Sequence, residues 1–187
     1  LLQAAFLLSR EGRCEQAAEY ADRAVELAAE VMGRRHFEVE KMSNHAHTIH
    51  ERCGNAERAE AHRVRALLLR LHIAGPGEEE SVRGVSRAAA DVLGSMEAWA
   101  DRVEREASGL APDDTGRAGF LVNAGLALQE AGDDDAAERA YLASHAALGD
   151  AERAATVTAM LRERIGAFYE SAGRPEEAEA WRARLSQ

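Results

Sequence analysis

The sequence predicts an all-α protein, a stack of about five helical hairpins. Three observations lead to this fold class. The chain of 187 residues is 46% apolar but only 5% aromatic and holds three prolines, which favours helices over a β-sandwich or a disordered tail. A short phrase centred on a glycine occurs four times. Small residues recur at fixed distances from these glycines, where the two helices of a hairpin must approach closely.

The repeated phrase predicts a helix-turn-helix. The third residue after each of the four glycines is acidic and the fifth is alanine. Glycine readily adopts the left-handed conformation that ends a helix, and an acidic side chain stabilises the first turn of the next helix. Asn55 and Asp133 are placed to cap second helices, and Pro175 fits a first helical position. The glycines are Gly12, Gly54, Gly132 and Gly173.

The spacing of the glycines sets the expected boundaries of the repeats. The outer pairs of glycines lie 42 and 41 residues apart, whereas 78 residues separate the middle two. One degenerate repeat is expected to fill this gap, with helices around 80–93 and 96–108. We expect a single domain over 1–187. We also expect it to be part of a longer protein, because the chain begins without methionine inside a helical pattern. The expected repeats are approximately 1–33, 37–75, 80–110, 117–149 and 155–187.

The repeat resembles the tetratricopeptide repeat family over nearly the whole chain. The phrases that carry the resemblance are REGRCEQAAEYADRA, ERCGNAERAEAHRVRA, EAGDDDAAERAYLAS and SAGRPEEAEAWRARL. The segment AVELAAEVMGRRHFEV is similar to a linker of the long-repeat subclass found in kinesin light chains, through Gly33, His36 and Val39. The resemblance implies a right-handed α-α superhelix whose first helices line a concave groove, and a function in protein or peptide binding.

The resemblance also implies which residues contact a partner. Two of the three asparagines of the chain lie on the groove row, where an amide can donate and accept hydrogen bonds to a peptide backbone. Asn123 followed by Arg164 is similar to part of a clamp for peptide C-termini, but Met160 takes the place of the clamp lysine, so this mode is not favoured. The predicted partner-binding residues are Asn44, His45, Thr48, Asn123, Gln129 and Arg164.

No catalytic signature accompanies these residues, so we predict no enzyme, no cofactor and no metal ligand. The sequence lacks a Gly-rich phosphate loop, a nucleophile elbow and a zinc signature. His45, His47 and His50 with Cys53 form a run that could bind a transition metal. However, His47 and His50 fall on helix-packing positions, and a structural role is the favoured interpretation. A metal-dependent enzyme centred on these histidines stays an alternative.

Charge and cysteine content define the expected environment. With 23 basic and 33 acidic residues the net charge is −10, which opposes nucleic acids and anionic membranes and makes an RNA-binding repeat a weak alternative. No apolar stretch is long enough to span a bilayer. Cys14 and Cys53 fit a reducing compartment in which thiols stay free, with a disulfide between them as the alternative, so we predict a cytoplasmic protein. The main alternative function is a sensory or oligomerisation segment of a bacterial transcription regulator, binding a signal peptide or its own copy.

Overall fold

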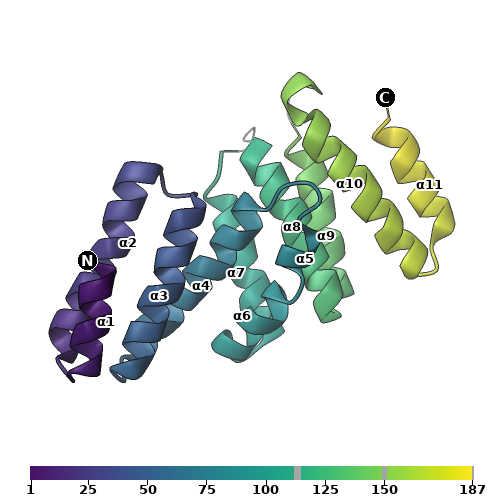
Figure 1. The fold of residues 1–187 in the computed structure, drawn as a ribbon. Helices are drawn as coiled ribbons and strands as arrows, with labels where there is room; N and C mark the ends of the chain where they lie inside the picture. Colours follow the sequence, from purple (N-terminus) through teal and green to yellow (C-terminus); the bar gives the residue numbers. More distant parts are fainter. Residues whose placement is uncertain (112–114, 149–150, 187) are drawn as a thin grey trace. The chain divides into compact units, whose positions relative to one another are not determined.

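A computed structural model describes residues 1–111, 115–148 and 151–186. Over these residues the chain is all-helical and contains no β-strand, as predicted (Figure 1). Its internal contacts divide it into two compact units. Unit 1 comprises Leu1–Ile73 with Asp91–Gly94, and unit 2 comprises Ala74–Ala90 with Ser95–Gln187. The prediction of a single domain over 1–187 stays a prediction, and the two units are described separately.

Unit 1 contains two hairpins. The first and second helices of each hairpin pack against each other, α2 also packs on α3, and α1 contacts α3 (Figure 1). Alanine, valine, leucine and isoleucine side chains from all four helices form its buried core. The helices are α1 (Leu2–Arg10), α2 (Cys14–Met32), α3 (Phe37–Arg52) and α4 (Ala56–Ile73).

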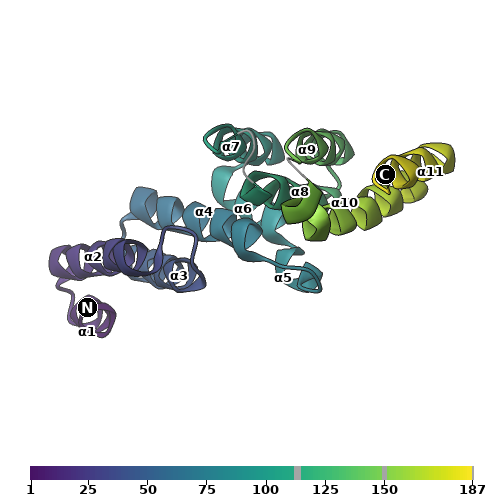
Figure 2. The ribbon, with the colours of Figure 1, turned by 90° about the horizontal axis from the view of Figure 1, so that it is seen from above.

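Unit 2 contains two long hairpins preceded by shorter helices. In Figure 2, α9 lies beside α8 and α11 beside α10, and α10 also packs on α8 and α9. The helix expected around 80–93 is interrupted, because Gly84 has a φ of 75° and separates α5 from α6. The helices are α5 (Glu79–Val82), α6 (Val85–Leu93, in unit 2 up to Ala90), α7 (Met96–Ser108), α8 (Thr115–Ala131), α9 (Asp134–Ala146), α10 (Ala151–Ser171) and α11 (Pro175–Arg184).

The four predicted helix-turn-helix turns are confirmed and share one geometry. All four turn glycines have φ between 72° and 86°. In each turn, the N–H of the residue after the glycine donates to the carbonyl oxygen five residues earlier, which closes a Schellman turn. Asp133 caps α9 by accepting from the Ala136 N–H at 3.0 Å, and Pro175 begins α11, as predicted. The closing bonds are Arg13 to Leu8 (2.9 Å), Asn55 to His50 (2.9 Å), Asp133 to Leu128 (3.0 Å) and Arg174 to Tyr169 (2.8 Å).

Small residues let the helices of each hairpin approach closely. The alanine five residues after each turn glycine is buried: Ala17, Ala137 and Ala178 are 0% exposed and Ala59 is 3% exposed. Glycine seven residues before the turn accepts a large side chain from the second helix. A Cβ atom built on Gly125 would lie 2.6 Å from the ring of Tyr141. The large side chain of Tyr141 therefore requires a glycine at position 125.

Gly125→Ala is expected to destabilise unit 2 by about 1–3 kcal/mol, because the added methyl group overlaps the Tyr141 ring. Gly119→Ala in the same helix is the matched control, because its added Cβ would meet its nearest atom, on Val157, at 3.8 Å. Alanine in place of a helical glycine should there be neutral or stabilising by up to about 1 kcal/mol. Urea unfolding followed by tryptophan fluorescence measures both variants, since Trp99 and Trp181 lie in unit 2. Equal effects of the two changes would contradict the close approach at Gly125.

The prediction of free thiols is wrong. Cys14 and Cys53 form a disulfide, with a Cα–Cα distance of 5.3 Å. Cys14 begins α2 just after the turn glycine Gly12, and Cys53 immediately precedes the turn glycine Gly54. Because α2 packs against α3, the turns of the two hairpins come together at one end of unit 1.

No helix within the described part of the chain is both long and apolar enough to cross a membrane.

Candidate functional site

An apolar groove lies between α1 and α3 in unit 1, and we call it the α1/α3 groove. Its volume is about 520 Å³. Two of its apolar side chains are unusually open to solvent for their type, since Phe6 is 41% and Leu7 is 58% exposed. The α1/α3 groove is lined by Leu2, Gln3, Phe6, Leu7, His45, Thr48 and Ile49.

Two of the predicted partner-binding residues, His45 and Thr48, line this groove. Asn44 precedes them on α3, and its amide already has two partners. Its Oδ1 accepts from the Arg63 guanidinium at 2.8 Å, and its Nδ2 donates to Glu40 at 3.4 Å. The amide is therefore held inside unit 1 by side chains of α3 and α4.

The charges at the groove are mainly positive. Helix α1 contains no acidic residue and ends with Arg10. The guanidinium of Arg52, on α3, lies 5.0 Å from the centre of the Phe6 ring, which is cation–π geometry. The nearest acidic side chains along the chain are Glu11, which pairs with Arg13 at 3.4 Å, and Glu51, which lies 3.5 Å from the Nε2 of His47. The groove thus combines an apolar floor with an available cation.

The predicted residues Asn123 and Arg164 meet in unit 2 but are buried, at 1% and 7% exposure. Arg164 donates to the Asn123 Oδ1 at 2.6 Å and to Glu79 at 3.1 Å, while the Asn123 Nδ2 donates to the carbonyl oxygen of Ala74 at 2.9 Å. Hydrogen bonds from its own backbone N–H and from Arg164 lower the pKa of Glu79. The network joins α5, α8 and α10, so a ligand would have to compete with these internal partners.

The last predicted residue, Gln129, bridges two hairpins of unit 2. Its Oε1 accepts from the Tyr141 hydroxyl at 3.1 Å, and its Nε2 donates to Ser171 at 3.4 Å. Of the six predicted residues, the structure thus brings His45 and Thr48 to one groove and Asn123 and Arg164 to one buried network.

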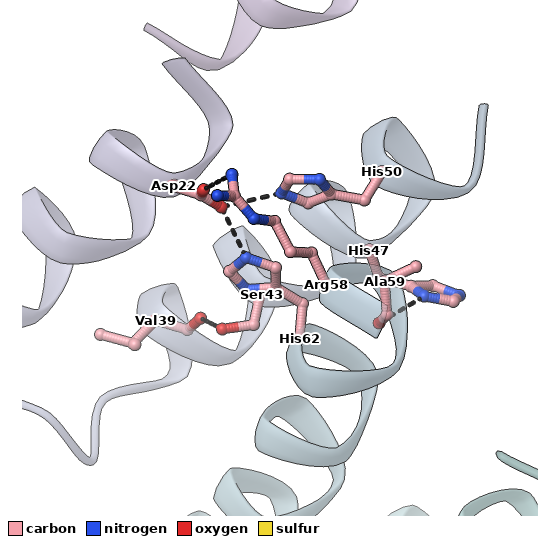
Figure 3. A network of polar contacts seen from close by, with 8 residues as sticks. All are labelled: Asp22, Val39, Ser43, His47, His50, Arg58, Ala59 and His62. Atoms are coloured by element: carbon pink, nitrogen blue, oxygen red, sulfur yellow. Dashed lines mark hydrogen bonds and ion pairs between the residues drawn. The ribbon is translucent and has the colours of Figure 1, made fainter. Parts of the chain in front are cut away.

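The histidine run of α3 does not assemble with Cys53, which is in the disulfide. His45 faces the α1/α3 groove, and the Nδ1 of His47 lies 3.0 Å from the carbonyl oxygen of Ala59 (Figure 3). His50 instead meets His62 of α4 and Asp22 of α2, neither of which the sequence analysis selected.

Asp22 holds both histidines through one oxygen atom. Its Oδ1 lies 2.8 Å from the Nε2 of His50 and 2.8 Å from the Nε2 of His62, and its Oδ2 accepts from Arg58 at 3.0 Å (Figure 3). Burial acts to raise the pKa of Asp22, but the hydrogen bonds to the two histidines outweigh it and the pKa is lowered. Burial lowers the pKa of His62 despite its bond to Asp22. We call Asp22, His50 and His62 the Asp–His cluster.

A weak sequence signal for the Asp–His cluster exists in the repeat. His50 lies four residues before Gly54 and His62 eight residues after it, and the equivalent residues around Gly173 are the packing aromatics Tyr169 and Trp181. These two positions lie on the first and second helices of one hairpin. An alignment of the four repeats at both positions would therefore have indicated that His50 and His62 face each other. Asp22 comes from the preceding hairpin, so only the packing of α2 on α3 reveals it.

Comparisons with known proteins do not assign the chain to a family. A scan against protein-family models finds no match, and a search of curated proteins finds no significant similarity. The class of protein that the fold defines is therefore an all-helical protein of paired, sequence-adjacent helices. The tetratricopeptide resemblance stays a hypothesis.

Proposed function

We propose that the chain is a tetratricopeptide-like scaffold that binds a peptide segment of another protein in the α1/α3 groove. The observation that carries the proposal is the groove itself. It is an open, mainly apolar groove with a volume of about 520 Å³, and its lining includes His45 and Thr48, which the sequence analysis predicted to contact a partner. Grooves between helices that offer apolar side chains beside a few polar groups are typical peptide-binding surfaces.

The repeat architecture supports a scaffold role. In a helical solenoid, first helices of successive hairpins pack side by side and present one continuous face. Within unit 1, α1 contacts α3, and within unit 2, α8 contacts α10, so first helices are neighbours in both units. A superhelix of about five such hairpins is the arrangement that we propose for the whole chain.

The chemistry of the α1/α3 groove selects the kind of peptide. Phe6 and Leu7 favour apolar side chains, and Arg52 at the Phe6 ring favours an acidic group beside them. His45 and Thr48 offer hydrogen bonds to a peptide backbone. The proposed ligand is therefore a segment that combines apolar and acidic residues, such as one face of an amphipathic helix.

Selection from a random peptide library displayed on phage tests this proposal. We expect peptides rich in apolar and acidic residues, and Thr48→Arg should weaken their binding at least about 10-fold, which is about 1.4 kcal/mol. The long arginine side chain would occupy the groove beside Phe6, and this steric loss should outweigh the attraction between its charge and the acidic residues of the peptide. Affinities of the synthesised peptides are measured by fluorescence polarisation.

Thr156→Arg is the matched control, because it adds the same charge at an exposed position of unit 2. Its affinity for the selected peptides should equal that of the wild type. Selected peptides that bind Thr48→Arg and Thr156→Arg equally well would remove the groove from the proposal. Light scattering on the same samples separates peptide capture from self-association, because a chain that binds its own copy in the groove forms a dimer that Thr48→Arg disrupts.

A further inference from the structure

We propose that Asp22, His50 and His62 form a binding site for one divalent transition metal ion, with Zn²⁺ as the best fit. The site is independent of the α1/α3 groove. Each of the three residues offers one ligand atom, a carboxylate oxygen or an imidazole nitrogen. These three atoms all lie within 4.8 Å of one another, which is close enough to hold one metal ion (Figure 3). Each residue comes from a different helix.

The directions of the three side chains suit coordination. Both Nε2 atoms point at the same carboxylate oxygen, each at 2.8 Å, and the two imidazole rings stack with centroids 5.2 Å apart and an interplanar angle of 12°. Zinc takes nitrogen and oxygen ligands at about 2.0–2.2 Å. An ion placed between the three atoms therefore requires each Nε2 atom and the Oδ1 atom to move apart from their 2.8 Å hydrogen-bond distance, which rotation of the side chains can provide.

Metal binding requires a change of tautomer at both histidines. Neutral imidazole must carry its proton on Nε2 to donate to Asp22, and must carry it on Nδ1 to bind a metal through Nε2. The hydrogen bond to Asp22 favours the Nε2–H tautomer of His50, and the buried Nδ1 of His50 has no hydrogen-bond partner. Moving the proton from Nε2 to Nδ1 leaves the ring neutral and makes its lone pair available to the ion.

Burial and charge also fit a site with an open position. The side chain of His50 is 0% exposed and that of His62 is 14% exposed, whereas Asp22 is 31% exposed and gives access from solvent. Three protein ligands would leave a fourth position of a tetrahedral ion for water. Arg58 repels a cation, but its side chain is 61% exposed and solvated, and its bond to the Oδ2 of Asp22 orients the carboxylate.

The donor set points to a borderline transition metal, of which zinc is the redox-inert member. Two imidazole nitrogens and one carboxylate oxygen exclude the hard cations Mg²⁺ and Ca²⁺, which prefer oxygen ligands, and suit Zn²⁺, Co²⁺ and Ni²⁺. Binding would connect α2, α3 and α4 at a point where three side chains now share hydrogen bonds. The ion would therefore stabilise unit 1 by mass action.

Titration of the untagged, oxidised protein with Zn²⁺ tests the site. We expect one ion per chain by calorimetry, a higher midpoint of thermal unfolding with Zn²⁺, and visible absorption bands when Co²⁺ replaces it. Asp22→Asn and His62→Gln should each weaken binding at least about 10-fold, since even partners outside the ligand set change affinity by that factor. Asp22→Asn keeps an oxygen that accepts hydrogen bonds, so its fold should persist.

His145→Gln is the control, because this histidine lies in unit 2 beside Trp181, and its affinity for Zn²⁺ should match the wild type. Nuclear magnetic resonance of the wild type provides a test without mutation: Zn²⁺ should shift the Nε2 signals of His50 and His62 and leave those of His145 unchanged. Wild-type protein that binds no stoichiometric Zn²⁺, or variants of Asp22 and His62 that retain full affinity, would overturn the proposal.

Discussion

Replacing Cys14 and Cys53 by serine is expected to lower the free energy of unfolding of unit 1 by about 4 kcal/mol. The disulfide joins residues with a sequence separation of 39. In the chain-entropy model, a cross-link of this length lowers the entropy of the unfolded chain, and its removal lowers the free energy of unfolding by about 4 kcal/mol. The loop contains all of α2 and α3, so both helices should be affected. Unit 1 has no tryptophan, and hydrogen exchange of peptides from α2 and α3 is the suitable measurement.

Reduction provides the matched comparison. Dithiothreitol should destabilise the wild type to the level of the Cys14→Ser/Cys53→Ser variant and should leave that variant unchanged. Peptides of α8 and α9 in unit 2 report whether the effect stays local. Equal hydrogen exchange in oxidised and reduced wild type would mean that the disulfide contributes nothing to the stability of unit 1.

Trp99→Ala is expected to destabilise unit 2 by about 3–5 kcal/mol, the usual cost of removing a buried tryptophan. Trp99 is 0% exposed, and its indole N–H donates to the Ser86 hydroxyl at 2.8 Å, which connects α7 to α6. Trp99→Phe should cost less, about 1–3 kcal/mol, because it retains most of the apolar volume but leaves the buried Ser86 without its donor. Urea unfolding followed by circular dichroism measures both variants.

Trp181 provides the control for Trp99. It is only partly buried, against His145 at a ring distance of 5.0 Å and under Arg184 at 4.6 Å. Trp181→Ala should therefore cost clearly less than Trp99→Ala. A loss for Trp99→Ala no larger than that for Trp181→Ala would contradict the greater contribution that we assign to the buried Trp99.

The turns of the hairpins could be predicted from the sequence because their causes are local. A glycine, the acid three residues later and the alanine five residues later act within one hairpin, and the geometry around Gly12 and Gly132 repeats in detail. The turns at Gly12 and Gly54 place Cys14 and Cys53 at equivalent ends of neighbouring hairpins. The prediction of free thiols failed because it rested on the compartment and ignored this geometry.

The environment of Asn123 and Arg164 could not be predicted in the same way. The repeat pattern predicts the face of α8 or α10 on which each residue lies. It does not predict which other segment of the chain packs on that face. Their partners, the carbonyl oxygen of Ala74 and the carboxylate of Glu79, come from the segment before Gly84 where the repeat pattern is absent. A face that is solvated in a regular repeat is therefore buried here.

The Schellman turns have a consequence for how the chain reaches its fold. Each of the four glycine turns is closed by a bond between residues five apart, and the two helices that it joins pack against each other. Many contacts of these hairpins therefore join residues near in sequence. Chains dominated by such local contacts fold fast, because little loop-closure entropy is lost before the first stabilising contacts form. During synthesis on the ribosome, α1 can pair with α2 as soon as Met32 has emerged, and the later hairpins can add to it one after another.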